Sequence, residues 1–307
     1  MKWRKIGFVF NSSVDVNGMD GYAMGPVAQL LGGNVFRIHY TARDKLKRGH
    51  LHFVDIDITS PGKILDMSAH ETLGPGKKGC FDDNGVFLGS LVVKDDKLKC
   101  YYAGFDVGAS IRFNAAIGLA TWNDSRLIFE RDFLGPIIEK DKYNPYFSTA
   151  PFVLCKDGKW DSWFVSCQGW DESDQSIHKY NIEHVTSTDG VNWNRTHDIA
   201  IDFEDSFEYA IARPSVLVDG NGYHMWFCSR ATRDIATYRI RYAKSRDGVT
   251  WERKPVEFVG LDVSSSGWDS EMICYPHVFD HKGKRYMLYN GNGYGRTGFG
   301  LAVLEEE

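Results

Sequence analysis

Carboxylate side chains stand at matching places ahead of several predicted strands. Asp20, Asp83 and Glu208 each precede by six residues a segment with a strand–turn–strand pattern, and Glu271 lies one residue from the equivalent place in another segment. Carboxylates gathered at one place repel each other, which separates their pKa values. One carboxyl group can then stay protonated as a general acid while another stays ionised, and cleavage of a glycosidic bond requires that combination.

The surroundings of these acids suggest different catalytic roles. Asp83 opens a strand directly after a Gly-Cys-Phe turn and stands next to Asp82, so we predict that it is the nucleophile or base. An aromatic residue on each side of Glu208 supplies apolar surroundings, which raise the pKa of a carboxyl group, so we predict Glu208 as the general acid. Glu271 is predicted to orient the substrate or to tune the other two carboxylates. The alternative is that these acids only form surface turns, in which Asp is common.

Arginine and aromatic side chains are candidates for binding a substrate. The guanidinium fork binds carboxylate and phosphate groups through two hydrogen bonds, and Arg43 and Arg213 are predicted to act in this way. The structural alternatives are an ion pair of Arg43 with Asp44 and of Arg213 with Glu208. Aromatic rings can stack on sugars, or they can simply pack between sheets. The further side chains predicted to contact the substrate are Asp20, Asp82, Trp170, Tyr209, Tyr275 and Arg296.

A repeat with a nearly constant step organises the chain. Pro26, Pro151, Pro214 and Pro276 each lead a short apolar strand, and the steps between them are 125, 63 and 62 residues. The first step is twice the length of the others, which predicts a further repeat at Gly89, where another strand–turn–strand pattern begins. Internal similarity with a period of this size is typical of propellers and other repeat folds.

The repeats predict the architecture. Each holds a second and a third strand, and the Asp-Gly turns at 189–190 and 247–248 lead to an outer strand. We predict an all-β fold with one domain over residues 1–307, a five-bladed β-propeller with about four antiparallel strands per blade. The last repeat ends before a fourth strand, so the N-terminal run Trp3–Phe10 is predicted to fill that place and close the ring, which removes open sheet edges. A β-sandwich with coincidental spacing is the alternative.

Composition excludes several classes of function. The formal net charge is −5 and the pI is about 6.1, which argues against a nucleic-acid or membrane-surface binder because both need a basic surface. No apolar run approaches the roughly 20 residues of a membrane span, and the N-terminal apolar stretch is too short for a secretory signal. The six cysteines include no Cys-x-x-Cys pair, and the ten histidines show no metal-ligand spacing. We predict a reduced, cytoplasmic protein without cofactor or catalytic metal, and the pattern favours no particular oligomeric state.

The residue patterns resemble those of the five-bladed propeller glycosidases. The resemblance rests on Ala-Arg-Pro at 212–214, Met-Trp-Phe at 225–227 and the run from Tyr238 to Trp251, together with the number of repeats. These glycosidases include the arabinanase/xylosidase and invertase/levansucrase groups and the mannoside phosphorylases. The stretches 79–86, 208–214 and 268–276 are more similar to a glycosidase-like bacterial subgroup that is often encoded near surface-polysaccharide genes.

The resemblance implies acids around a pocket on the propeller axis, but not their individual roles. The invertase motif Asn-Asp-Pro is missing from the first repeat, and Pro145 and Tyr146 stand where the related families place an acid. We expect a glycoside hydrolase that acts on a carbohydrate or a sugar phosphate. The alternatives are an enzyme that transfers a glycosyl unit to another sugar or to phosphate from the same pocket, and a carbohydrate-binding propeller without catalysis.

Overall fold

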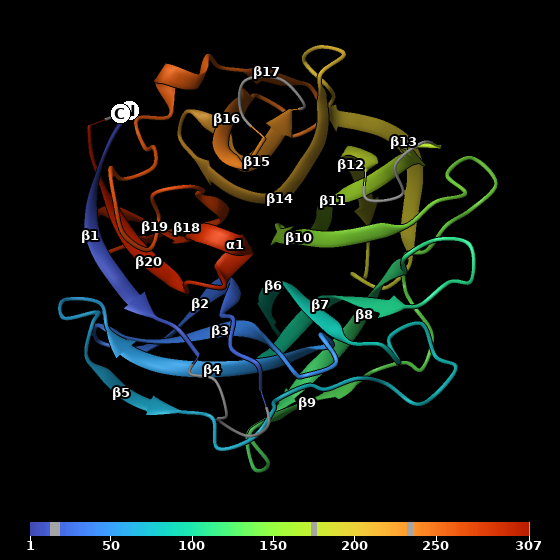
Figure 1. Cartoon of the computed structure of the whole chain (residues 1–307), viewed down its shortest axis with the longest axis horizontal. Coiled ribbons are helices and arrows are strands. Elements are labelled where there is room, and N and C mark those ends of the chain that lie inside the picture. Colours follow the sequence, from blue (N-terminus) through green and yellow to red (C-terminus); the bar gives the residue numbers. More distant parts are fainter. Residues whose placement is uncertain (13–18, 173–176, 232–235, 307) are drawn as a thin grey trace.

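The chain folds almost entirely into β-strands. The computed structural model describes residues 1–12, 19–172, 177–231 and 236–306, and Figure 1 shows their arrangement. Within these ranges the helical segments are the 3-10 turn η2 (Val256–Phe258) and the short helix α1 (Asn292–Gly295). Neither of them has the length or the apolar character that crossing a membrane would demand.

Consecutive antiparallel strands form the sheets. The first sheet contains β2 (Met24–Gly32), β3 (Val35–Arg43), β4 (Gly49–Asp57) and β5 (Ile64–Met67). The second contains β6 (Val86–Lys94), β7 (Lys97–Asp106), β8 (Asn114–Asn123) and β9 (Ile128–Arg131).

A wider sheet follows, and it consists of two groups of strands. Counting the first two sheets as the first and second groups, the third group contains β10 (Ser148–Lys156), β11 (Lys159–Trp170), β12 (His178–Ser187) and β13 (Trp193–Ile201). The fourth contains β14 (Glu208–Asp219), β15 (Gly222–Ala231), β16 (Arg239–Ser245) and β17 (Trp251–Arg253). The two groups count as one sheet because Tyr180 on β12 pairs in parallel with Ala210 on β14.

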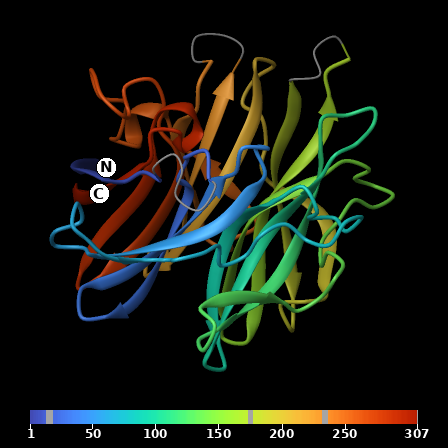
Figure 2. The same ribbon diagram turned by 60° about the horizontal axis from the view of Figure 1, so that its bottom comes forward.

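The last sheet brings the two ends of the chain together. It contains β18 (Cys274–His281), β19 (Lys284–Asn290) and β20 (Phe299–Glu306), and β1 (Lys2–Phe10) pairs antiparallel with β20 as the outermost strand. Figures 1 and 2 both show the termini side by side. The prediction that the N-terminal run supplies the fourth strand of the last repeat is therefore confirmed.

The innermost strands β2, β6, β10, β14 and β18 surround one axis. Each contacts the next along the sequence, and β18 contacts β2, as can be followed in Figure 1. Ser90 and Ser215 accept hydrogen bonds from the backbone N–H groups of Val153 and Val278 on the following innermost strand, at 3.0 and 2.9 Å. We call the end at which these strands begin the upper face. Figure 2 shows the strands running lengthwise between two ends where the connections gather.

A bulge recurs just before the repeated prolines. A residue with positive φ precedes each of them: Gly25 (58°), Ala150 (46°), Arg213 (58°) and Tyr275 (53°). Pairing with the second strand changes register at the same place, and in the second sheet the change falls at Gly89. Proline has no N–H group for a ladder hydrogen bond, and a bulge is one of the few places in a sheet that accepts it. The constant spacing in the sequence is therefore the spacing of these bulges.

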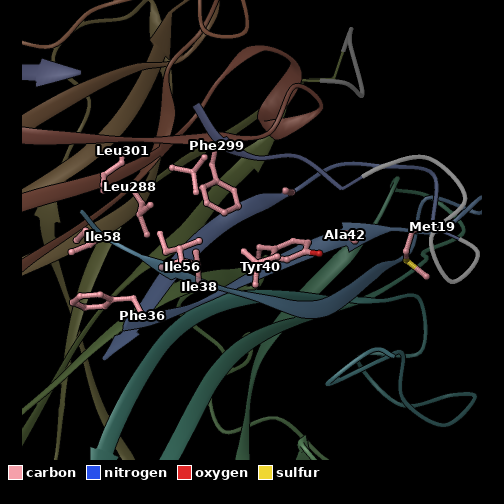
Figure 3. Packing of buried hydrophobic residues seen from close by; sticks show 13 residues of the cluster. Met19, Phe36, Ile38, Tyr40, Ala42, Ile56, Ile58, Leu288, Phe299 and Leu301 are labelled. Carbon is pink, nitrogen blue, oxygen red and sulfur yellow. The ribbon is translucent and has the colours of Figure 1, made fainter. Parts of the chain in front are cut away.

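Apolar side chains join neighbouring sheets. Phe36 and Ile38 of the first sheet pack with Leu288, Phe299 and Leu301 of the last, as Figure 3 shows. Comparable clusters fill the spaces between the other neighbouring groups. Burial of apolar surface therefore contributes to holding the first and last sheets together.

Replacing Leu301 by Ala tests the packing between the first and last sheets. The side chain is fully buried, so its truncation leaves a cavity and should lower the free energy of unfolding by about 2–5 kcal/mol. Leu134→Ala is the control, because Leu134 is 63% exposed and its truncation should cost less than about 0.5 kcal/mol. Urea unfolding followed by Trp fluorescence measures both, and equal losses would contradict this packing.

Candidate functional site

Acids that precede the innermost strands are bound by cations from the outermost strands. In the second sheet, the buried Asp82 accepts a hydrogen bond from Arg131 of β9 at 2.7 Å. In the last sheet, Asp269 is bound by Lys5 of β1 at 2.7 Å. Each of these carboxylates also accepts a hydrogen bond from a tyrosine hydroxyl of the second strand, at 3.0 and 3.1 Å. We call this arrangement, an acid before the innermost strand bound to a cation of the outermost strand, the strand latch.

The third and fourth groups have the same latch. Arg195 of β13 binds Asp141 at 3.0 Å, and Arg253 of β17 donates to both oxygens of Glu208 at 2.7 and 2.9 Å. Every latch cation also lies over a ring of the second strand, with distances to the ring centre of 5.9 Å for Arg131 on Tyr102, 5.6 Å for Arg195 on Phe164, 5.4 Å for Arg253 on Phe227 and 5.9 Å for Lys5 on Tyr289. Of the acids that the sequence places ahead of the strands, Glu208 therefore stabilises the fold through an ion pair.

The latch changes the interpretation of Glu208. Burial raises the pKa of this carboxyl, but the hydrogen bonds and charge of Arg253, together with hydrogen bonds from Glu204 and Ser229, lower it by more, so that the pKa lies below its ordinary value. The prediction of a raised pKa at Glu208 is therefore wrong, because the ion pair outweighs the aromatic neighbours. Asp82 is likewise turned to Arg131 and away from its neighbour Asp83.

Asp83 lies in a cavity of about 700 Å³ between the first and second sheets on the upper face. A second carboxylate, Asp106 at the end of β7, lines the same cavity together with Arg48. Asp83 accepts a hydrogen bond from the Gly79 N–H at 2.8 Å, and Asp106 accepts one from the Asn114 amide at 2.9 Å. Asp106 is not among the predicted site residues. Its place could have been inferred, because β7 runs antiparallel to β6 and therefore ends beside the start of β6, near Asp83.

A polar network lies behind the cavity. Arg48 donates to Asp44 at 2.8 Å, and Asp44 also contacts Nε2 of the buried His50 at 3.2 Å. Nδ1 of His50 pairs with Glu71. Burial lowers the pKa of His50, but the two carboxylates raise it by more, to above its ordinary value. Because Asp44 binds Arg48, the alternative of an Arg43–Asp44 ion pair is wrong.

Asp20, Arg43 and Arg296 lie close together. The Asp20 N–H donates to the carbonyl oxygen of Arg43 at 2.6 Å. The Asp20 carboxylate pairs with Lys47, and this hydrogen bond, together with the charges of Lys47 and Arg296, lowers its pKa. The guanidinium of Arg43 lies over the ring of Tyr22, 5.1 Å from its centre. The three predicted residues therefore form one rim, where positive charges act on the Asp20 carboxylate.

Arg213 crosses the axis. Its guanidinium donates to the carbonyl oxygens of Gly25 on β2, at 3.0 Å, and of Gly89 on β6. It lies 5.4 Å from the ring centre of Phe87, which in turn meets the ring of Tyr275 at 5.6 Å. Arg213 is 3% exposed, and burial lowers its pKa to about 10. Arg213 therefore bridges strands on opposite sides of the axis, and Glu208 pairs with Arg253 in its place. The substrate contact of Arg213 stays a prediction.

Tyrosines gather around Arg230 of β15. The guanidinium lies 4.9 Å from the ring centre of Tyr209, 5.1 Å from that of Tyr238 and 5.9 Å from that of Tyr294, whose hydroxyl accepts a hydrogen bond from it at 2.8 Å. The ring of Tyr238 also contacts Tyr275, at 6.1 Å. We call Arg230 with these four residues the tyrosine cluster. Figure 1 shows α1, which carries Tyr294, near the centre of the ring of strands.

Trp170 belongs to an aromatic wall beside this cluster. Its ring contacts Phe113 at 5.4 Å and His178 at 4.8 Å. His178 stacks on Tyr180 at 5.2 Å, and the Tyr180 hydroxyl is hydrogen-bonded to that of Tyr238. The predicted residues Trp170, Tyr209 and Tyr275 are thus connected through ring contacts, whereas Arg230 is missing from the sequence prediction. The signal that could have identified Arg230 is its place at the end of β15, because the second strand of each group ends at the upper face.

Glu271 lies exposed near α1. Its backbone N–H donates to the Asn292 side chain at 2.8 Å, and its carbonyl oxygen accepts hydrogen bonds from Thr237 and Arg239 at 2.8 and 3.0 Å. These contacts fix the backbone and leave the role of the carboxylate a prediction. In the described part of the chain, no three His, Cys, Asp or Glu side chains gather as a metal site would require.

Comparison with known proteins places the sequence in a family. No family model matches it. The uncharacterized protein Rv1502 of Mycobacterium tuberculosis is 41% identical over 305 residues, which cover 99% of this chain and 100% of that protein. The protein belongs to the Rv1502 family. The protein MT1551 from another strain of the same species shows the same identity and coverage.

Solved structures show which fold the Rv1502 family shares. A structure of a BT0996 RGII complex superposes with a TM-score of 0.72 at 17% identity, covering 99% of this chain and 91% of that one. The endo-arabinase from Bacteroides thetaiotaomicron superposes with a TM-score of 0.64 at 13% identity, covering 98% of both chains. The neighbours are five-bladed propeller glycoside hydrolases, so the resemblance that the sequence suggests is confirmed for the fold.

Arg131→Met tests the strand latch of the second sheet. The substitution leaves the buried Asp82 carboxylate without its cation, so the free energy of unfolding should fall by about 3–5 kcal/mol. The double variant Asp82→Asn/Arg131→Met should lose less than the sum of the two single losses, because the two side chains interact. Arg126→Met is the control, since Arg126 pairs with Glu130 in an exposed ion pair worth about 0–1 kcal/mol. Additive losses in urea unfolding would rule out the latch.

The latch at Glu208 predicts a pH dependence of stability. Because the folded-state pKa is lowered, the contribution of Glu208 is complete above the unfolded-state pKa of about 4.3. It is lost as the pH falls through the lower pKa of the folded protein. Glu208→Gln should therefore be less stable than the parent protein at pH 7, with a gap that narrows from about pH 5 to pH 3. Urea unfolding across this range measures the gap, and a constant gap would contradict the prediction.

Proposed function

We propose that the protein is a single-domain, five-bladed β-propeller enzyme that cleaves glycosidic bonds at the upper face. The four-stranded groups that begin with β2, β6, β10, β14 and β18, the last completed by β1, are then the blades. Similarity in fold to glycoside hydrolases supports a carbohydrate substrate. The observation that carries the activity is that two carboxylates, Asp83 and Asp106, line one cavity.

Asp83 is the nucleophile or base in this proposal, and Asp106 is the second carboxylate. Their hydrogen bonds come from a backbone N–H and a neutral amide, so these contacts leave both free to exchange a proton. Glycosidic cleavage needs one carboxylic acid to protonate the leaving oxygen while the other carboxylate attacks the anomeric carbon or takes a proton from water. A cavity of about 700 Å³ lies within the usual size of a ligand pocket.

The latch argues for this pair of carboxylates over the pair that includes Glu208. A carboxylate held at both oxygens by Arg253 is stabilised as the anion, which is the wrong form for a general acid. Arg48 and Asn84 line the cavity beside Asp83 and can bind substrate hydroxyl groups. Glu271 stays assigned to substrate orientation, from its exposed place beside α1.

Substitution of each carboxylate by its amide tests the proposal. Asp83→Asn and Asp106→Asn should each lower kcat on an active aryl glycoside or oligosaccharide by about 100-fold or more, because each removes a group that moves a proton or attacks carbon. Glu257→Gln, an exposed acid in η2, is the control and should leave kcat unchanged. Circular dichroism checks the fold, and full activity in both cavity variants would disprove the assignment.

A carbohydrate-binding propeller without turnover is the second candidate. The observation that favours it is that Asp82 and Glu208 are engaged in latches, which leaves fewer free acids than the sequence suggests. Calorimetric binding of sugars by the unmodified protein, with no product from the same sugars after prolonged incubation, would favour this candidate. Turnover that depends on added phosphate would instead identify a glycoside phosphorylase.

A further inference from the structure

Arg230 differs from the latch arginines because no carboxylate of the described residues binds it. Arg131, Arg195 and Arg253 are each bound by a carboxylate. Among the described residues, the contacts of Arg230 are tyrosine rings and the Tyr294 hydroxyl, and its Nε–H is buried without a hydrogen-bond acceptor. The guanidinium of Arg230 is therefore available to an anionic ligand, whereas the guanidinium groups of the latch arginines already bind carboxylates.

A partly buried cation without a counter-ion is costly, because it loses hydration without gaining a partner. The tyrosine rings compensate in part, since the ring faces carry negative charge. Their hydroxyl groups, like the guanidinium, can donate hydrogen bonds to an incoming anion. Arg230 and Tyr209 are both partly exposed, so a ligand can reach them from the upper face.

We propose that the tyrosine cluster binds a carboxylate or phosphate group carried by the sugar substrate, an inference that rests on the proposed function. The guanidinium of Arg230 donates to Tyr294 through Nη1, and its remaining N–H groups and positive charge can bind such a group. The aromatic faces beside it suit stacking of the attached sugar ring. The substrate class is then a glycoside of a uronic acid or of a phosphorylated sugar.

A chain of aromatic contacts connects the cluster to the strand that ends at the cavity residue Asp106. Phe105, which precedes the cavity residue Asp106, contacts Phe113 at 5.6 Å, and Phe113 contacts Trp170 at 5.4 Å. From Trp170 the ring contacts lead through His178 and Tyr180 to the cluster. This chain of ring contacts passes through the buried rings of Tyr180 and Tyr238 and couples the packing of the cluster to that of the strand that ends at Asp106.

Positive charges lie beside this route. Tyr294 of the cluster is in α1, and Arg296 directly follows that helix and faces Asp20 together with Lys47. Among the described residues, Lys47, Lys45 and Arg296 all act on the Asp20 carboxylate, so cations predominate around it. Such a rim raises the local concentration of anionic substrates and loses that effect as salt screens it.

Calorimetry with Asp83→Asn protein tests the site without turnover. The probes are glucuronate, galacturonate, glucose 6-phosphate and mannose 6-phosphate, each against its neutral parent sugar, and inorganic phosphate. At least one anionic sugar should bind about 10-fold or more tightly than its neutral parent, and Arg230→Gln should abolish that preference, because a charged hydrogen-bond pair contributes more than a neutral one. Arg230→Lys should retain part of the preference, since it keeps the charge and loses the fork.

Arg246→Gln is the matched control, because Arg246 is exposed beyond the other end of the same strands, after β16, and should keep the full preference. Near-UV circular dichroism confirms that the Arg230 variants fold. If no anionic sugar binds better than its neutral parent, or if inorganic phosphate binds as tightly as the hexose phosphates, the proposal is overturned. Neither result bears on hydrolysis by Asp83 and Asp106, which the activity assay tests separately.

Discussion

A carboxylate before or at the start of an innermost strand, bound to a cation from the outermost strand of the same sheet, recurs in four of the strand groups. A buried carboxylate is tolerable only when it is paired, so the loop before an innermost strand is stable only when the outermost strand is in place. The last sheet shows the consequence most clearly. Lys5 and Asp269 are separated by 264 residues, so this latch forms only when the two ends of the chain meet.

The same constraint divides the charged residues of the upper face into two sets. Asp82, Glu208 and Asp269 are oriented by their latches and serve the fold. Asp83 and Asp106 in the cavity, with Arg230 among its tyrosines, are oriented by neutral groups and remain available to a ligand. Of the acids in the repeated frame, Glu208 is held in a latch whereas Asp83 lines the cavity, so the partner of each acid, and not its place in the repeat, separates structural acids from candidates for chemistry.

The fold could be predicted from the sequence more completely than the site. Proline at a bulge is a local requirement, so the step between repeats is visible in the sequence, and so is the need for a strand to complete the last sheet. The roles of the acids depend on partners far away in the chain. Whether Asp82 or Asp83 faces Arg131 is decided by one residue of register, and the pKa of Glu208 is decided by Arg253, 45 residues later. The sequence around Asp82 or around Glu208 therefore predicts neither the partner of Arg131 nor the pKa of Glu208.

The bridge made by Arg213 limits how a large molecule can use the ring. Its guanidinium reaches from β14 to carbonyl groups of β2 and β6, and Phe87 and Tyr275 pack beside it. A polymer can therefore not thread through the middle from one side to the other. Under the proposed function, a long carbohydrate chain would therefore reach the site and leave it from the upper face alone.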